Sequence, residues 1–119
     1  MAATIKRLKV GPRMSQAVIA NGFVYLAGQV ATDPGADTAG QTRQILATID
    51  ALLAEAGTDK SRLLTAQIFL TDMADFGAMN GVWDAWVSPG NTPARATVQS
   101  ALAGPQWKVE IVVSALMPV

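Results

Sequence analysis

The spacing of apolar residues along the chain predicts a mixture of short strands and two amphipathic helices. Segments that alternate or are rich in β-branched residues predict strands over 4–10, 15–20, 23–27, 63–71, 93–99 and 107–116. Apolar residues recur every three to four positions over about 40–56, and again from the acidic turn at 72–75 to Val87. These two segments are predicted to be helices.

Turn residues fix several of the boundaries. Asn21-Gly22 separates the second and third strands, and this dipeptide favours a two-residue type I′ hairpin. Gly57 follows the first helix as a C-terminal cap. Two helices among six strands, without repeated βαβ spacing, predict an α+β fold with a mostly antiparallel sheet and both helices on one face. The other face of the sheet then needs a cover, and oligomerisation is the economical way to provide it.

The last predicted strand carries apolar residues on both faces, which indicates a central position in the sheet. Glu110 lies in the middle of this strand. A carboxylate at such a position is expected to be at least half-buried and to need a polar partner. A structural acid, satisfied by backbone donors or by Arg95, is one role for such a residue.

Arg95 lies in a short strand that follows the turn at 90–93. Alternation along a strand places Arg95, Thr97 and Gln99 on one face. The neighbours of Arg95 are two alanines, which are too small to cover it, and a guanidinium held this way is a good fork for a carboxylate. The alternative is a solvated arginine with no ligand.

Composition restricts the chemistry further. The 119 residues are expected to form one domain over 1–119, with 50% hydrophobic and only 15% charged residues. Cysteine and histidine are both absent, so thiol chemistry, disulfides and a Ser-His-Asp triad are excluded. Any catalysis must rely on carboxylates, arginine, backbone groups and water.

Charge and hydropathy also limit the partners. The net charge is zero, and nothing in its distribution favours nucleic acid or an anionic membrane. The N-terminus lacks the pattern of a signal peptide, and the apolar run over 17–30 is interrupted by Asn21-Gly22. We therefore expect a cytoplasmic protein without nucleic-acid or membrane partners.

Several short motifs together resemble one known family. They are Gly-Pro at 11–12, Ser-Gln-Ala-Val at 15–18, Ala-Gly-Gln-Val at 27–30, Thr-Asp-Met-Ala-Asp-Phe at 71–76, Thr-Pro-Ala-Arg at 92–95 and Lys-Val-Glu-Ile at 108–111. In order and spacing the chain resembles the Rid family, the YjgF-type reactive-intermediate deaminases. The resemblance covers essentially the whole chain, and its most specific parts are the Pro-Ala-Arg segment and the late Val-Glu-Ile strand.

The resemblance implies a chorismate-mutase-like α+β fold and a homotrimer with a central barrel and ligand clefts between subunits. It implies hydrolysis of 2-imino or 2-enamino acids to 2-keto acids and ammonia, without a metal or organic cofactor. Arg95 would hold the substrate carboxylate, Glu110 would position or activate water, and Thr97 would contribute through its backbone. Gly28 would allow the backbone to approach the cleft closely.

Two departures from the family pattern affect the expected cleft. Arg13 and Met14 stand where active deaminases carry a tyrosine, and Ala27 stands where they tend to carry serine or threonine. Met14 and Ala27 would then line the substrate pocket without supplying hydroxyls. A non-catalytic trimer that binds small carboxylate metabolites is therefore an alternative function. An isomerase of chorismate-mutase type ranks last, because the sequence offers one candidate arginine and no second cation for a dicarboxylate.

Overall fold

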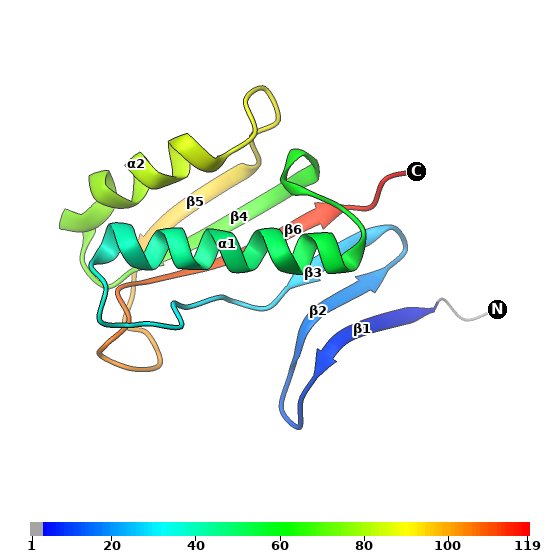
Figure 1. Cartoon of the computed structure of the whole chain (residues 1–119), viewed down its shortest axis with the longest axis horizontal. Helices are drawn as coiled ribbons and strands as arrows, with labels where there is room; N and C mark the ends of the chain where they lie inside the picture. Colours follow the sequence, from blue (N-terminus) through cyan, green and yellow to red (C-terminus); the bar gives the residue numbers. More distant parts are fainter. Residues whose placement is uncertain (1–3) are drawn as a thin grey trace.

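The computed structural model describes residues 4–119 as a single six-stranded sheet with two α-helices on one face (Figure 1). The strands are β1 (Ile5–Val10), β2 (Ser15–Ala20), β3 (Phe23–Leu26), β4 (Leu63–Leu70), β5 (Ala94–Gln99) and β6 (Val109–Leu116). The α-helices are α1 (Thr38–Ala56) and α2 (Phe76–Trp86), and two 3-10 turns, η1 (Lys60–Arg62) and η2 (Met73–Asp75), precede β4 and α2. The α+β prediction with both helices on one face is confirmed.

The order of strands in the sheet is β1-β2-β3-β6-β4-β5. All neighbours are antiparallel except β4 and β5, which are parallel and are connected through α2. The last strand of the chain therefore lies between β3 and β4, as its two apolar faces predicted. It begins at Val109 rather than at residue 107, because the backbone N–H groups of Trp107 and Lys108 bond to the Gly104 carbonyl and to the Gln41 side chain instead of to a neighbouring strand.

The turns behave as their residues predict. Asn21 and Gly22 both have positive φ, 52° and 82°, as a type I′ turn requires, and they join β2 to β3. Helix α1 begins at Thr38, slightly earlier than predicted, because the Asp37 carboxylate accepts a hydrogen bond from the Gly40 backbone N–H. It ends at Gly57, whose φ of 98° fits the left-handed cap.

Helix α2 differs from its prediction at the N-terminal end. Asp72 caps the preceding 3-10 turn, and Asp75 instead accepts a hydrogen bond from the Thr38 hydroxyl at 2.9 Å, which ties α2 to α1. Met79 and Trp83 enter the core as the apolar stripe predicted. Phe76, at the start of the same stripe, remains 40% exposed at the outer edge of the sheet.

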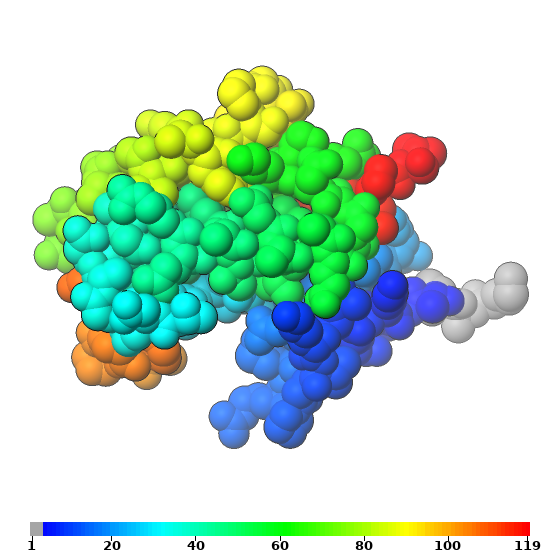
Figure 2. Space-filling view, in the orientation of Figure 1, coloured from blue at the N-terminus to red at the C-terminus, as the bar shows by residue number. Residues whose placement is uncertain are grey.

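The core lies between the helices and one face of the sheet, and it includes Ile45, Ile49 and Leu53 of α1 and Ile111 of β6. No element within residues 4–119 covers the opposite face of the sheet (Figure 1), which we call the open face. Aromatic and aliphatic side chains remain exposed there, with Phe23 at 39%, Tyr25 at 52% and Val98 at 43%. Figure 2 shows that α1 and α2 form one continuous surface, whereas the β1–β2 hairpin projects beyond it.

None of the helices over residues 4–119 has the length and apolar character needed to cross a membrane. Within the same residues, no group of three or more acidic, histidine or cysteine side chains is placed to hold a metal ion.

Candidate functional site

Arg95 extends from the edge strand β5 toward helix α2. Its neighbours in the same row of the sheet are Ala66 and Val113, both buried on the helix side, so Arg95 projects from that same face. The guanidinium carbon lies 5.3 Å from the centre of a Trp83 ring and 6.0 Å from the Phe76 ring. Contacts of this kind contribute about 0.5–1 kcal/mol at exposed sites, and they fix the planar group in one orientation.

This arrangement leaves the hydrogen-bonding edge of the guanidinium for a ligand. The two aromatic rings lie close to the guanidinium without neutralising its charge, and within residues 4–119 its N–H groups make no side-chain hydrogen bond or ion pair. A carboxylate could therefore bind in the bidentate geometry that arginine favours. The sequence prediction of an anion-binding arginine on a rigid element fits this geometry.

Two polar atoms without partners lie on the same side of the sheet as Arg95. Among the described residues, Asn80 Oδ1 and Thr97 Oγ1 are buried and lack a hydrogen-bond partner. Thr97 follows Arg95 by two residues in β5, so both side chains project from one face. Asn80 lies between Phe76 and Trp83 on the helix surface that contacts Arg95, because residues three and four apart share a face. Buried polar atoms usually have partners, so these two atoms point to a water or ligand group.

Glu110 lies on the open face of the sheet, near the start of β6. Its neighbour in the next strand is Phe69, which in turn pairs with the exposed Val98. The residue that makes room for its carboxylate is Gly28: a Cβ atom built there would come within 2.4 Å of Glu110 Oε2. Gln29 holds this segment to β6, because it exchanges both backbone hydrogen bonds with Ile111, at 2.9 and 3.1 Å. The structure therefore brings Gly28 and Glu110 into contact.

Within one chain, Arg95 and Glu110 project from opposite faces of the sheet. Arg95 belongs to the face covered by helices, and Glu110 belongs to the open face. Two residues so placed cannot contact one small ligand within a single copy. A shared ligand would require the β5 edge of one copy to lie against the open face of another.

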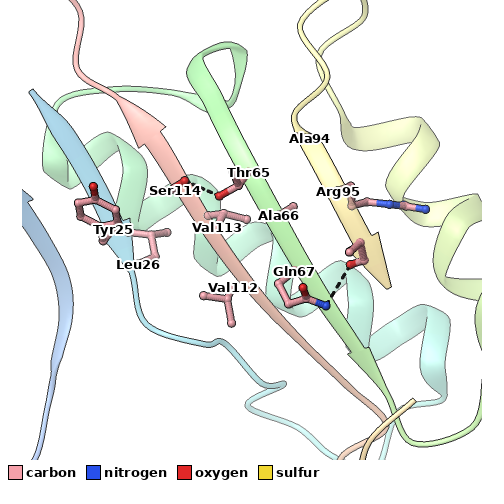
Figure 3. Close-up of a pocket in the computed structure, with 11 residues that line it drawn as sticks. Tyr25, Leu26, Thr65, Ala66, Gln67, Ala94, Arg95, Val112, Val113 and Ser114 are labelled. Atoms are coloured by element: carbon pink, nitrogen blue, oxygen red, sulfur yellow. Dashed lines mark hydrogen bonds between the residues drawn. The ribbon is translucent and has the colours of Figure 1, made fainter. Parts of the chain in front are cut away.

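A hollow of about 530 Å³ lies on the open face, and Figure 3 shows the residues around it. Its walls include Tyr25, Gln67 and Val112, together with the hydrogen-bonded hydroxyls of Thr65 and Ser114. Arg95 borders the hollow through its backbone, but its side chain points away from it toward α2 (Figure 3). Glu110 is not among the residues that surround it. The hollow is therefore a feature of the open sheet face that Arg95 borders without its guanidinium and that Glu110 does not line.

The remaining predicted pocket residues lie on the Glu110 side of the fold or beyond it. Ala27 precedes Gly28, is partly buried, and donates its backbone N–H to the Gln16 carbonyl at 2.9 Å. Met14 lies in the turn between β1 and β2, where its side chain is 48% exposed. Met14 is not among the residues that surround the hollow of the open face.

Sequence reasoning did not select Asn80, Phe76 and Trp83 as site residues. The two aromatic residues were assigned to the core, which describes Trp83 but not the outer part of Phe76. The sequence signal that could have identified Asn80 is its spacing, which places this polar residue between two aromatic residues on one helix face. The pairing of this face with Arg95, by contrast, depends on how α2 packs beside β5.

Comparisons with known proteins agree with this fold. The family model described as Endoribonuclease L-PSP matches residues 4–117. A RutC family protein of Haemophilus ducreyi is 50% identical over 111 residues, covering 93% of this chain and 95% of the relative. The RutC family protein YoaB of Escherichia coli is 48% identical over 108 residues, covering 91% and 94% of the two chains.

Solved structures give the same result. A YjgF family member from Neisseria meningitidis superposes with a TM-score of 0.93 at 49% identity, covering 98% of this chain and 97% of that one. A Rid family protein of unknown function from Yersinia pestis superposes with a TM-score of 0.84 at 33% identity, covering 98% and 100%. The chain belongs to the Endoribonuclease L-PSP family, which is the YjgF, RutC and Rid family. The family resemblance inferred from the short motifs is confirmed.

Proposed function

We propose that the protein hydrolyses reactive 2-imino and 2-enamino acids to 2-keto acids and ammonia. The observation that carries the proposal is the Arg95 guanidinium, which lies beside Trp83 and Phe76 and has no hydrogen-bond partner within residues 4–119. An arginine of this kind suits a small carboxylate, and the resemblance of the sequence motifs to reactive-intermediate deaminases supports this choice of substrate.

The proposed site is formed between two copies of the chain. Arg95 of one copy holds the carboxylate, and Glu110 of the next copy faces the reacting carbon. This division follows from the opposite faces on which the two side chains lie. The exposed aromatic residues of the open face, Phe23 and Tyr25, supply apolar surface for an interface between copies. We propose a cyclic homotrimer with its sheets around a central barrel.

Glu110 acts first as a base and then as an acid in this scheme. It accepts a proton from water as the water oxygen bonds to C2 of the iminium group, which gives a carbinolamine. It then returns the proton to the amine nitrogen. As the C–N bond breaks, the hydroxyl proton passes to Glu110 and the C2 carbonyl forms; the ammonia released takes up this proton from Glu110 and leaves as ammonium. The site holds the substrate, supplies a positioned water and moves protons through one carboxylate, so no histidine or cysteine is required.

Asn80 and Thr97 would complete the Arg95 side of the site. Their unpaired oxygen atoms lie on the same face as the guanidinium and can accept hydrogen bonds from an imine or amine N–H or from a bound water. Gly28 would bring backbone close to the substrate on the Glu110 side. No metal or organic cofactor takes part in this scheme.

A second candidate function is the binding of small carboxylates without catalysis. The observation that favours it is the side chain at position 27, where alanine precedes Gly28 and offers no hydroxyl beside Glu110. In this case Arg95 would still hold a 2-keto acid, and the bound state could regulate a partner. The two functions differ in whether Glu110 affects a reaction rate.

The test is a coupled assay in which an amino-acid oxidase generates imino acids in the presence of the protein. Wild type should accelerate the formation of 2-keto acid over the buffer rate. Arg95→Ala removes hydrogen bonds worth about 1.5–3 kcal/mol each, so KM should rise roughly 10-fold or more. Glu110→Gln should instead lower kcat, since an amide cannot accept the proton.

Arg43→Ala is the matched control, because Arg43 is an exposed cation on α1. It should behave as wild type. Equal rates for wild type, Arg95→Ala and Glu110→Gln would exclude the deaminase. In that case thermal stabilisation by 2-keto acids, lost in Arg95→Ala, would support the binding function.

A further inference from the structure

Gln41 is a fully buried polar side chain in helix α1, with 0% of its surface exposed. Its amide nitrogen donates to the carbonyls of Pro34 and Ala36, both at 3.1 Å, and to that of Gln106 at 3.3 Å. Its amide oxygen accepts a hydrogen bond from the backbone N–H of Lys108 at 2.9 Å. One side chain therefore ties α1 to the loop before it and to the residues that lead into β6. In Figure 1 this orange segment lies beside the beginning of α1.

The segment that Gln41 holds is paired with a neighbouring strand on one side only. Strand β6 begins at Val109, which pairs with Leu70 of β4, and the Lys108 carbonyl accepts a hydrogen bond from the Thr71 backbone N–H at 3.1 Å. On one side of β6, the ladder with β3 extends only over Ser114 to Leu116, at the far end of the strand. Nearer to Glu110, that side is held by the single bridge between Gln29 and Ile111. Beyond its pairing with β4, the approach of the chain to Glu110 is therefore held by this bridge and by the Gln41 hydrogen bonds.

We infer that Gln41 is a positioning residue for the Glu110 carboxylate. It fixes the backbone two residues before Glu110, and hence the direction in which that side chain leaves the strand. The inference rests on the role proposed above for Glu110. Without the Gln41 amide, the Lys108 N–H and the Gln106 carbonyl would lose their side-chain partner, and this segment would shift toward solvent, where water can replace it.

Gln41→Met is the variant that tests this inference, because methionine keeps the length of the side chain and removes its hydrogen bonds. A carboxylate displaced by about an ångström should lower kcat roughly 10- to 100-fold. KM should change less than about twofold, since substrate binding depends on Arg95 of the neighbouring copy. Gln41→Glu keeps an acceptor for Lys108 and is the second variant if Gln41→Met does not fold; its kcat should be intermediate.

Thr42→Val is the matched control. Thr42 is also fully buried in α1, but its hydroxyl donates within the same helix, to the Thr38 carbonyl at 2.7 Å. Its replacement should lower the melting temperature while kcat and KM stay at the wild-type values. An equal effect of Gln41→Met and Thr42→Val on kcat would overturn the inference, because it would reduce Gln41 to a general contribution to stability.

A second measurement separates this inference from the proposed function. The ¹³C NMR signal of the Glu110 side-chain carboxyl reports its surroundings whether or not the protein catalyses a reaction. It should shift in Gln41→Met and stay in place in Thr42→Val. If wild type is inactive but the signal still shifts in Gln41→Met, the proposed deaminase activity is wrong and the positioning role of Gln41 stands. An unchanged signal in Gln41→Met would overturn the positioning role.

Discussion

The smallest residue of the candidate site has the most direct effect on Glu110. Gly28 lies so close to the carboxylate that a single methyl group there would overlap it. A clash with the end of a flexible side chain is relieved by moving that side chain rather than the backbone. Because glycine has no side chain, it leaves the space at position 28 in which the Glu110 carboxylate lies.

Gly28→Ala should therefore lower kcat while the protein remains folded. The added Cβ at 2.4 Å from Glu110 Oε2 forces the carboxylate to rotate away, and misplacement on this scale costs roughly 10- to 100-fold in rate. Steady-state kinetics and a circular dichroism spectrum measure the two effects. The double variant Gly28→Ala with Glu110→Asp, whose acid is one methylene shorter, should recover part of the loss relative to Glu110→Asp alone. A wild-type kcat in Gly28→Ala would mean that the carboxylate position does not limit the reaction.

At the scale of elements, helix α2 supports the arginine but is intrinsically weak. Phe76 and Trp83 on one of its faces lie beside Arg95, so the helix must stay formed for the guanidinium to be held. Gly81 lies on the exposed side of this helix, and a Cβ atom built there meets nothing within 4 Å. The packing of this chain does not require glycine at that position.

Gly81→Ala should stabilise the protein by about 1 kcal/mol, because alanine is the better helix former and the site has room for its methyl group. The melting temperature should rise by roughly 4 °C, and KM for an imino acid should stay unchanged. Thermal denaturation measures the first effect and the coupled assay measures the second.

Gly40→Ala in α1 is the matched comparison for this prediction. Its Cβ would lie 2.9 Å from the Cβ of Ala36, so the same substitution should destabilise the protein despite the same gain in helix propensity. If both variants change stability in the same direction, local space does not decide the effect.

At the scale of the whole molecule, the two halves of the candidate site lie on different faces of one sheet. If each site is assembled from two copies, two inactive variants can complement each other in a mixed oligomer. Arg95→Ala lacks the arginine of each site and Glu110→Gln lacks the acid. In a mixed ring, some interfaces join an intact Arg95 to an intact Glu110.

Mixing these two inactive variants should therefore restore activity. After unfolding and refolding together at equal amounts, about one quarter of the interfaces in a randomly mixed cyclic oligomer should be wild-type in both residues. The specific rate should approach that fraction of the wild-type value, and light scattering should give the mass of a trimer. Each variant refolded alone is the control. No gain on mixing would place both residues in separate functions.

The fold could be predicted from the sequence where local chemistry decides it. Asn21-Gly22 specifies a type I′ turn because both residues tolerate positive φ, and Gly57 ends α1 for the same reason. The helical period and the two apolar faces of the last strand are also local patterns, so the elements and the central place of β6 follow from them. The Pro-Ala-Arg and Val-Glu-Ile segments likewise indicated the family.

Tertiary structure decided what these patterns could not. The contacts of Arg95 with Phe76 and Trp83, the buried Asn80, and the tie from Gln41 to residues 106–108 join segments far apart in the chain. Alternation along each strand assigned a face to Arg95 and to Glu110 separately, but it could not relate the two faces. That relation depends on the pairing of β4 with both β5 and β6, since only neighbours in the same sheet define a common face.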